Sequence, residues 1–234
     1  MRYMAIGAHP DDLELRCYGT LAKLKAQGHE IAVCNIANGC LGSMTIPPEK
    51  LKIIRSSEAK KAAATIGAKH YEIGVDDMQV NRFDEEASRR LVDAIRNFKP
   101  DVIFLLSPDD YHKDHIEASW LTFYASFSSS LPNYVTDEPN HPVVPVLYYM
   151  DNTRGLHFDP TEYVDISDYV DLRLKAFCCH ESQLEWLNGH TGADMLEKTK
   201  LHAAFRGYQC GVEYAEAFRL CDRSLRVVPG SLLP

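Results

Sequence analysis

Residues 3–12 read YMAIGAHPDD, an apolar run that ends on a histidine, a proline and two aspartates. A short apolar run of this kind predicts a buried β-strand, with the polar residues at its carboxyl end. A second apolar run, DVIFLL at residues 101–106, is followed by HKDH at residues 112–115. Two imidazoles and a carboxylate are a ligand set of catalytic zinc sites that keep one coordination position open. The sequence therefore indicates metal-assisted hydrolysis.

Apolar runs alternate with helical patterns along most of the chain. We expect strands near residues 3–8, 30–37, 70–74, 101–107 and 145–150, and helices near residues 15–27, 48–66, 84–98, 115–127, 166–180 and 193–208. This alternation predicts an α/β fold with a Rossmann-like, doubly wound, mostly parallel sheet and helices on both faces. In the usual order of such sheets the first and fourth strands are neighbours, and ligands bind beyond their carboxyl ends. Both His/Asp clusters follow those two strands.

Composition bounds the class of protein. With 234 residues, 45% of them hydrophobic and 25% charged, we expect one soluble domain over residues 1–234. The formal charge of −8 disfavours nucleic acid and suits a small neutral or basic substrate. No apolar run approaches the roughly 18 residues of a membrane span, and no signal peptide is visible, so we expect a cytoplasmic protein without a membrane partner. Seven scattered cysteines without a C-x-x-C pair fit reduced thiols.

The first cluster alone is weak evidence for a metal. His9 and Asp12 are three residues apart just past a strand, and in the alternative reading His9 caps the following helix while Asp11 and Asp12 stabilise its positive end. The second cluster, His112 to His115, could likewise be a solvated loop that enters a helix. Taken together, however, the second cluster supplies the third ligand that the first lacks, which favours the metal hypothesis.

At this point the chain resembles the PIG-L/LmbE-like family of zinc-dependent N-acetylglucosaminyl deacetylases. AHPDD at residues 8–12 matches the family's signature, and PDDYHKDH at residues 108–115 matches its P-x-D-x-H-x-D-H element. The agreement continues through Gly19-Thr20-Leu21, Asn38-Gly39, Arg55-x-x-Glu58, Asp165-Ile166-Ser167, His180-x-Ser182-Gln183 and Tyr214-Ala215-Glu216-Ala217-Phe218. The resemblance covers nearly the whole chain and implies an LmbE-like fold.

The resemblance also implies residue roles. His9, Asp12 and His115 would bind Zn²⁺, with Fe²⁺ as another candidate ion. Asp11 would be the general base that takes a proton from water. His112, held by Asp114, would be a protonated imidazole that stabilises the oxyanion or protonates the leaving amine.

Two further residues receive roles around this site. Arg55 would hold sugar hydroxyls in the pocket, although a mid-helix surface ion pair is the alternative. Glu14 would accept a hydrogen bond from the far nitrogen of His9 or His115 and so fix that ring, or alternatively would only stabilise the positive start of the helix. The chain departs from many relatives at Arg16 and Tyr18, where those carry Gly, and large side chains there could narrow the mouth or change what it recognises.

The expected function is a zinc-dependent N-deacetylase that acts on an N-acetylglucosamine-containing small glycoconjugate or amino sugar. An amidase for a larger acyl or thiol-conjugate amide is a close alternative. A non-catalytic zinc protein would not need Asp11 and His112, and a nucleotide-binding Rossmann module would need a G-x-G-x-x-G turn where this chain has Pro10. By analogy with the family, we expect a homo-oligomer, a trimer or a hexamer.

Overall fold

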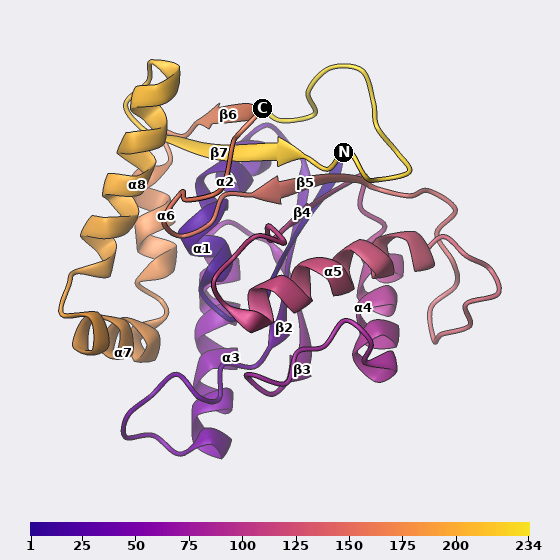
Figure 1. The fold of residues 1–234 in the computed structure, drawn as a ribbon, viewed down its shortest axis with the longest axis horizontal. Coiled ribbons are helices and arrows are strands. Elements are labelled where there is room, and N and C mark those ends of the chain that lie inside the picture. Colours follow the sequence, from indigo (N-terminus) through magenta and orange to yellow (C-terminus); the bar gives the residue numbers. More distant parts are fainter.

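The computed structural model describes residues 1–234 and contains one seven-stranded sheet in the order β3-β2-β1-β4-β5-β7-β6 (Figure 1). The strands are β1 (Arg2–Gly7), β2 (Glu30–Ala37), β3 (Lys69–Val75), β4 (Val102–Leu105), β5 (Val146–Met150), β6 (Glu162–Asp165) and β7 (Ala215–Leu220). The first five pair in parallel, whereas β7 runs antiparallel to β5 and to β6. The predicted α/β fold with a mostly parallel sheet is confirmed.

Helices cover both faces of this sheet. They are α1 (Asp12–Arg16), α2 (Tyr18–Ala26), α3 (Pro48–Thr65), α4 (Glu85–Phe98), α5 (Lys113–Ser128), α6 (Val170–Phe177), α7 (Glu181–Thr191) and α8 (Met195–Cys210). Helices α4 and α5 pack together on one face, and α1, α2, α3 and α8 contact the strands from the other (Figure 1). None of the helices combines the length and the apolar character needed to cross a bilayer.

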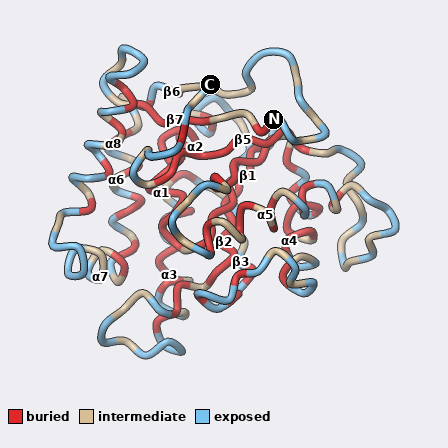
Figure 2. Tube along the Cα trace, in the orientation of Figure 1, coloured by how far each residue is buried: buried red, intermediate tan, exposed pale blue.

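The central strands β1 and β4 form the middle of the core. Every residue of β4 is buried, and in β1 only Arg2 is partly exposed (Figure 2). Strands covered by helices on both faces need apolar side chains on both sides, which explains why these two segments read as continuous apolar runs. Because β1 and β4 are paired neighbours, the loops that follow them meet at one edge of the sheet.

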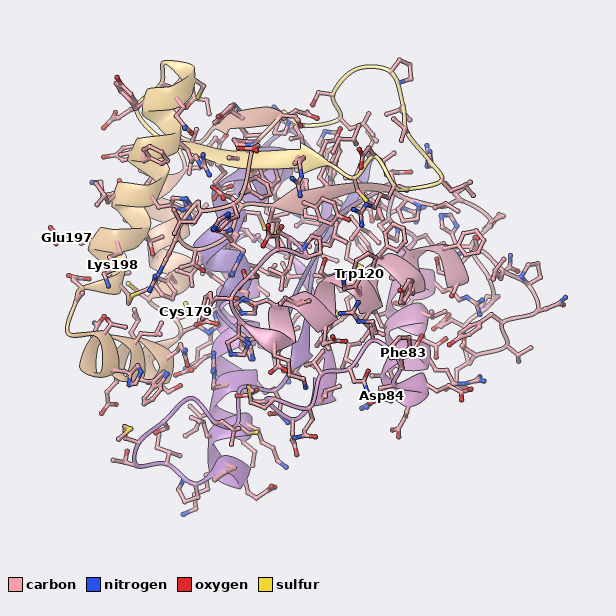
Figure 3. All side chains as sticks on the ribbon, viewed as in Figure 1. Phe83, Asp84, Trp120, Cys179, Glu197 and Lys198 are labelled. Carbon is pink, nitrogen blue, oxygen red and sulfur yellow. The ribbon has the colours of Figure 1, made fainter.

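Helix starts follow local capping chemistry where it is available. Asp84, labelled in Figure 3, precedes α4, and its carboxylate accepts hydrogen bonds from the N–H groups of Glu86 and Ala87 at 3.0 Å each. His112 occupies the same position before α5, where its ring accepts a hydrogen bond from the N–H of Asp114. Such caps satisfy N–H groups that have no partner within the helix.

The structure departs from the predicted elements in two places. The helix expected over residues 15–27 is two helices, separated at Cys17, because Glu216 on β7 accepts hydrogen bonds from the N–H groups of Gly19 and Thr20 at 2.9 and 2.7 Å. A carboxylate from far along the chain thus supports a new helix start. The antiparallel strands β6 and β7 and the helix α7 were not predicted.

Candidate metal and catalytic site

The first site loop, residues 8–12, joins β1 to α1 and carries two adjacent carboxylates. Asp11 has a φ of 117°, a backbone conformation that residues other than glycine rarely adopt. Asp12 turns its Oδ2 back to accept hydrogen bonds from the N–H groups of Ala8 and His9, at 3.0 and 2.8 Å. Both acids are buried. The strained turn therefore gives the two neighbouring carboxylates different surroundings.

The second site loop, residues 106–115, joins β4 to the first turn of α5 and brings two histidines to His9. The ring centroid of His9 lies 4.9 Å from that of His112 and 5.3 Å from that of His115. The rings of His112 and His115 stack at 4.7 Å. One ligand atom from each of the three imidazoles lies within 4.8 Å of the others, a spacing that could hold a metal ion.

A carboxylate lies against one nitrogen of two of these imidazoles. Nε2 of His9 lies 3.2 Å from Oδ2 of Asp114, and Nδ1 of His115 lies 3.0 Å from Oδ1 of Asp110. Since a carboxylate accepts, we infer that each of these nitrogens carries the proton and leaves the other nitrogen of its ring free. Nη2 of Arg16 also lies 3.3 Å from Nδ1 of His115, so this assignment rests on the shorter contact with Asp110. The free nitrogens both face Asp12: His9 Nδ1 is 3.8 Å from its Oδ2, and His115 Nε2 is 3.3 Å from its Oδ1.

This donor set fits a divalent transition metal. The carboxylate of Asp12 lies near an imidazole nitrogen of His9 and one of His115, and two imidazoles with one carboxylate suit Zn²⁺ and also Fe²⁺. Each imidazole has a carboxylate on its far nitrogen, which is the usual way in which proteins orient a metal-binding histidine. Burial alone would raise the pKa of Asp12, but His115 and Arg16 outweigh it and hold this pKa well below its usual range. Asp12 is therefore ionised, as a ligand must be.

His112 differs from the other two histidines. Its Nδ1 accepts the N–H of Asp114 at 3.1 Å, so that the neutral ring carries its proton on Nε2. Burial, together with His9 and His115, lowers the pKa of His112. The carboxylate of Asp114 accepts from His9 and from the N–H of Met78 and does not hold the ring of His112 as expected. Protonation of His112 stays a prediction.

Asp11 lies beside the guanidinium of Arg55. Burial raises the pKa of Asp11 to about 6, against the opposing effect of the Arg55 guanidinium. Nη2 of Arg55 is 3.3 Å from Oδ1 of Asp11 and also donates to the carbonyl of Pro10. Nη1 of Arg55 donates to the carbonyl of Gly39 at 3.4 Å. Arg55 thus ties the first site loop to the loop after β2, and its contact with sugar hydroxyls stays a prediction.

Gly39 is the glycine on which this arrangement depends. Its φ of +78° is a conformation that glycine adopts freely. A Cβ at this position would lie 2.5 Å from Cδ of Arg55. The Asn38-Gly39 pair in the sequence therefore leaves room for the guanidinium beside Asp11.

Glu14 takes a different partner from the one expected. Its Oε1 lies 3.3 Å from Nε2 of the fully buried His180, while Asp114 and Asp110 orient His9 and His115. Asp110 is the residue that sequence reasoning missed. Its position within the matched element at residues 108–115, five residues before His115, was the available signal.

Arg16 and Tyr18 do not line an open mouth, because both are buried, at 3% and 0% exposure. Nη1 of Arg16 donates to Oδ1 of Asp12 at 2.6 Å, and its Nη2 lies 3.6 Å from Oδ2 of Asp110. Neither residue therefore narrows an open mouth directly, and their effect on what the site recognises stays a prediction. Arg16 instead contacts one of the predicted ligands directly.

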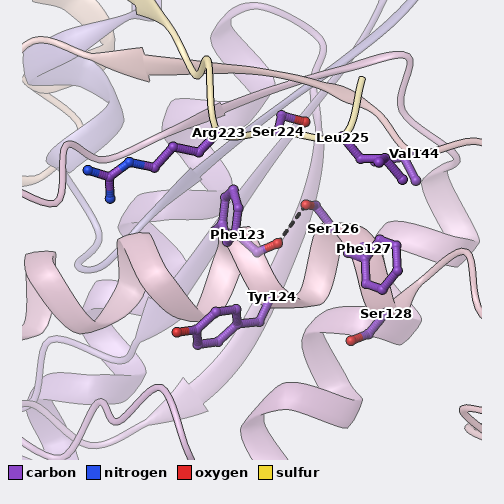
Figure 4. A pocket seen from close by; sticks show the side chains of 9 residues that line it. All are labelled: Phe123, Tyr124, Ser126, Phe127, Ser128, Val144, Arg223, Ser224 and Leu225. Atoms are coloured by element: carbon purple, nitrogen blue, oxygen red, sulfur yellow. Dashed lines mark hydrogen bonds between the residues drawn. The ribbon is translucent and has the colours of Figure 1, made fainter. Parts of the chain in front are cut away.

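The cavity drawn in Figure 4 is separate from this centre. It has a volume of about 400 Å³ and lies between the second half of α5, from Phe123 to Ser128, and the chain segment from Arg223 to Leu225. His115, in contrast, lies in the first turn of α5. Eight residues of helix, about 12 Å along the axis, separate His115 from Phe123. We therefore assign the cavity no part in the metal centre.

A family model described as PIG-L, GlcNAc-PI de-N-acetylase, matches residues 4–126. The chain belongs to this family. The matched residues run from β1 into α5 and include both site loops. The resemblance that the two motifs indicated is confirmed for the PIG-L family.

Individual relatives and solved structures resemble the chain over most of its length. Diacetylchitobiose deacetylase of Thermococcus kodakarensis is 26% identical over 249 residues, which cover 99% of this chain and 85% of that protein. The structure of N,N'-diacetylchitobiose deacetylase from Pyrococcus horikoshii matches with a TM-score of 0.79 at 26% identity, covering 94% of this chain and 83% of that one. GalB, the 4-carboxy-2-hydroxymuconate hydratase of Pseudomonas putida KT2440, matches with a TM-score of 0.82 at 22% identity, covering 98% of this chain and 99% of that one. The last likeness concerns the fold alone.

Proposed function

We propose that this PIG-L family member is a metal-dependent hydrolase that removes the N-acetyl group from an N-acetylglucosamine-containing small glycoconjugate or amino sugar. One observation carries the proposal. The hydrogen bonds of Asp114 and Asp110 leave the free nitrogens of His9 and His115 facing Asp12. Asp11 and the Nε2–H of His112 stay outside that set and remain available for chemistry.

His9 Nδ1, His115 Nε2 and the carboxylate of Asp12 would hold the ion, which we propose to be Zn²⁺. When bound, such an ion polarises an amide carbonyl and makes water more acidic, with a pKa near about 7. The protein already orients each of these donors. Asp114 and Asp110 hold the rings of His9 and His115, and two backbone N–H groups hold the carboxylate of Asp12.

Asp11 is the proposed general base. It takes a proton from the water whose oxygen attacks the acetyl carbon, and it hands that proton to the amide nitrogen as the C–N bond breaks. The products are acetate and a free amine, and no covalent enzyme intermediate forms. A pKa of about 6 lies close to neutral pH, which favours a group that must both accept and return a proton.

His112 is the proposed oxyanion donor. Because its Nδ1 accepts the N–H of Asp114, its Nε2–H is the remaining donor, and a neutral imidazole can present it to the carbonyl oxygen as negative charge develops there. This role needs no protonated ring, in agreement with the lowered pKa of His112. The sequence-based hypothesis of oxyanion stabilisation is retained, and protonation of the amine passes to Asp11.

The substrate class rests on similarity and on charge. A relative named diacetylchitobiose deacetylase covers almost the whole chain, which favours an N-acetylated amino sugar. The formal charge of −8 suits a neutral substrate whose product is a cation. Residues 1–234 would act as one catalytic domain in a trimer or hexamer, which light scattering after gel filtration tests directly.

The decisive experiment is a substrate screen. Protein loaded with Zn²⁺ is incubated with N-acetylglucosamine, with diacetylchitobiose and with an N-acetylglucosaminyl conjugate, and acetate and primary amine are measured together. We expect equal amounts of both products, and no product from the Asp11→Asn variant carrying the same metal. Release of a larger acyl or thiol-conjugate acid in place of acetate would favour the amidase alternative, and no amine from any amide would refute the proposal.

A further inference from the structure

Arg16 is a fully buried cation in the metal centre that the proposed reaction does not use. Its side chain is 1% exposed and lies between two carboxylates, Asp12 and Asp110, whose side chains are 4% and 1% exposed. Nη1 donates to Oδ1 of Asp12 at 2.6 Å, and Nη2 lies 3.6 Å from Oδ2 of Asp110 and 3.3 Å from Nδ1 of His115. The guanidinium therefore touches one predicted ligand and the acid that orients another.

Arg16 is not needed to orient Asp12. The other carboxylate oxygen of Asp12 accepts two backbone N–H groups, from Ala8 and His9, and these fix the side chain without the guanidinium. His115 is likewise oriented by Asp110, through Oδ1, which is not the oxygen nearest to Arg16. What Arg16 adds to the centre is consequently its charge.

A fixed positive charge at this place has two opposite effects. In the metal-free protein it offsets two buried carboxylates, which would otherwise repel each other and lose their hydration without compensation. Toward a divalent cation it is repulsive, and it also occupies Oδ1, the Asp12 oxygen that faces His115 at 3.3 Å. The same contact that stabilises the metal-free site thus competes with the metal.

We propose that Arg16 is an internal counter-ion of Asp12 and Asp110 that keeps the metal-free site folded and weakens the binding of the divalent ion. The proposal rests on the proposed metal centre but not on the substrate. It assigns Arg16 a role in setting the metal affinity through its charge, and it predicts that the metal-free protein is a stable, folded species from which a chelator removes the ion without unfolding the chain.

The test compares wild type, Arg16→Gln and Arg16→Lys as metal-free proteins. Zn²⁺ affinity is measured by competition with a chromophoric chelator, and Co²⁺ binding by visible absorption, while thermal denaturation is followed with and without Zn²⁺. We expect Arg16→Gln to bind Zn²⁺ more tightly by on the order of tenfold or more, because a buried like charge is removed. It should also have a lower Tm without metal and a larger rise of Tm with it. Arg16→Lys, which keeps the charge, should stay close to wild type.

A matched control separates this effect from general destabilisation. Arg96 is equally buried, at 2% exposure, but it lies on α4 and donates to loop carbonyls such as those of Ser129 and Tyr134. Arg96→Gln should lower the Tm and leave the Zn²⁺ affinity unchanged. If Arg16→Gln folds only with metal, the rate of Zn²⁺ release into excess chelator replaces the affinity, and it should be slower than in wild type.

The outcomes are distinguishable from failure of the proposed function. Equal or weaker Zn²⁺ binding, or equal or faster release, in Arg16→Gln would overturn the role of Arg16. If wild type and the Arg16 variants differ in Zn²⁺ affinity and Tm as predicted, but the wild-type protein releases no amine, the role of Arg16 stands and only the deacetylase activity is refuted. If Arg16→Lys behaved like Arg16→Gln, charge would not be the cause and the proposal would fail.

Discussion

The two site loops reach the same centre by different means. In the first loop, residues 8–12, Asp12 accepts two N–H groups of the loop itself, Asp11 has a φ of 117°, and Arg55 donates to the carbonyl of Pro10 from outside. The second loop, residues 106–115, is held by side chains, with His112 as the cap of α5 and Asp110 on the ring of His115. The two backbone hydrogen bonds hold the carboxylate of Asp12 in place. In the second loop, hydrogen bonds to the rings of His112 and His115 determine which nitrogen of each ring carries the proton. Each loop therefore supplies at least one proposed metal ligand and a proposed reacting group: His9, Asp12 and Asp11 in the first loop, and His115 and His112 in the second.

The largest expected effect concerns the metal and tests that division within the second loop. His115→Ala removes a proposed ligand and should leave the protein largely without zinc, whereas His112→Ala should retain about one ion per chain. The measurement is elemental analysis after dialysis against Zn²⁺ at equal protein concentration. A His112→Ala protein that lost its metal would place His112 in the ligand set, in agreement with the clustering of all three imidazoles.

The order of the strands and the position of both site loops could be predicted from the sequence, because both depend on residues that are close together in the chain. The apolar runs of β1 and β4 are buried on both faces, and polar residues follow directly after each run. This pattern predicted both the strands and the loops that carry the site. The tautomers were not, because Asp114 holds His9 from across the sheet edge, 105 residues away.

Strands β6 and β7 in the C-terminal part of the chain could not be predicted, because their pattern also depends on a contact with residues far away in the sequence. Strand β6 has four residues, and β7 reads AEAFRL, in which the buried Glu216 interrupts the apolar pattern. That glutamate is buried because it accepts the N–H groups at the start of α2, 197 residues away. A pattern that depends on a contact so distant in sequence cannot be read from the local order of residues.

The second prediction tests the strained residue of the first loop. Asp11→Asn should keep zinc but lose activity by about 10² to 10⁴-fold, the usual contribution of a positioned general base. The check is kcat/KM for the best substrate of the screen, with metal content measured on the same sample. Near-full activity with metal bound would mean that the base lies elsewhere, since Asp12 is already committed to backbone N–H groups and to Arg16.

The third prediction sharpens the contrast between Asp11 and His112. His112→Ala removes the Nε2–H donor and should lower kcat by about 10²-fold, the scale of losing one oxyanion donor. His112→Gln, whose amide can still donate a hydrogen bond, should recover part of that loss. A neutral donor predicts such rescue, whereas a proton-donating imidazolium predicts none, so the pair of variants separates the two roles that the sequence left open for this residue.

The smallest expected effect crosses from one loop to the other. The carboxylate of Asp114 is fully buried and accepts from Nε2 of His9 at 3.2 Å and from the N–H of Met78 at 2.6 Å. Asp114→Asn keeps the size of the side chain but replaces a charged acceptor with a neutral one, and should weaken zinc binding by about 10 to 100-fold, as the loss of such an orienting partner usually does. Glu14→Gln is the matched control, because Glu14 pairs with His180 and not with a predicted ligand, so its zinc affinity should equal that of wild type. The zinc affinities of both variants are measured by chelator competition. If Glu14→Gln weakened zinc binding and Asp114→Asn did not, Glu14 would be the partner of a metal-binding histidine, as the sequence first suggested. The hydrogen bond between Asp114 and His9, which joins the two loops, would then have no part in holding the ion.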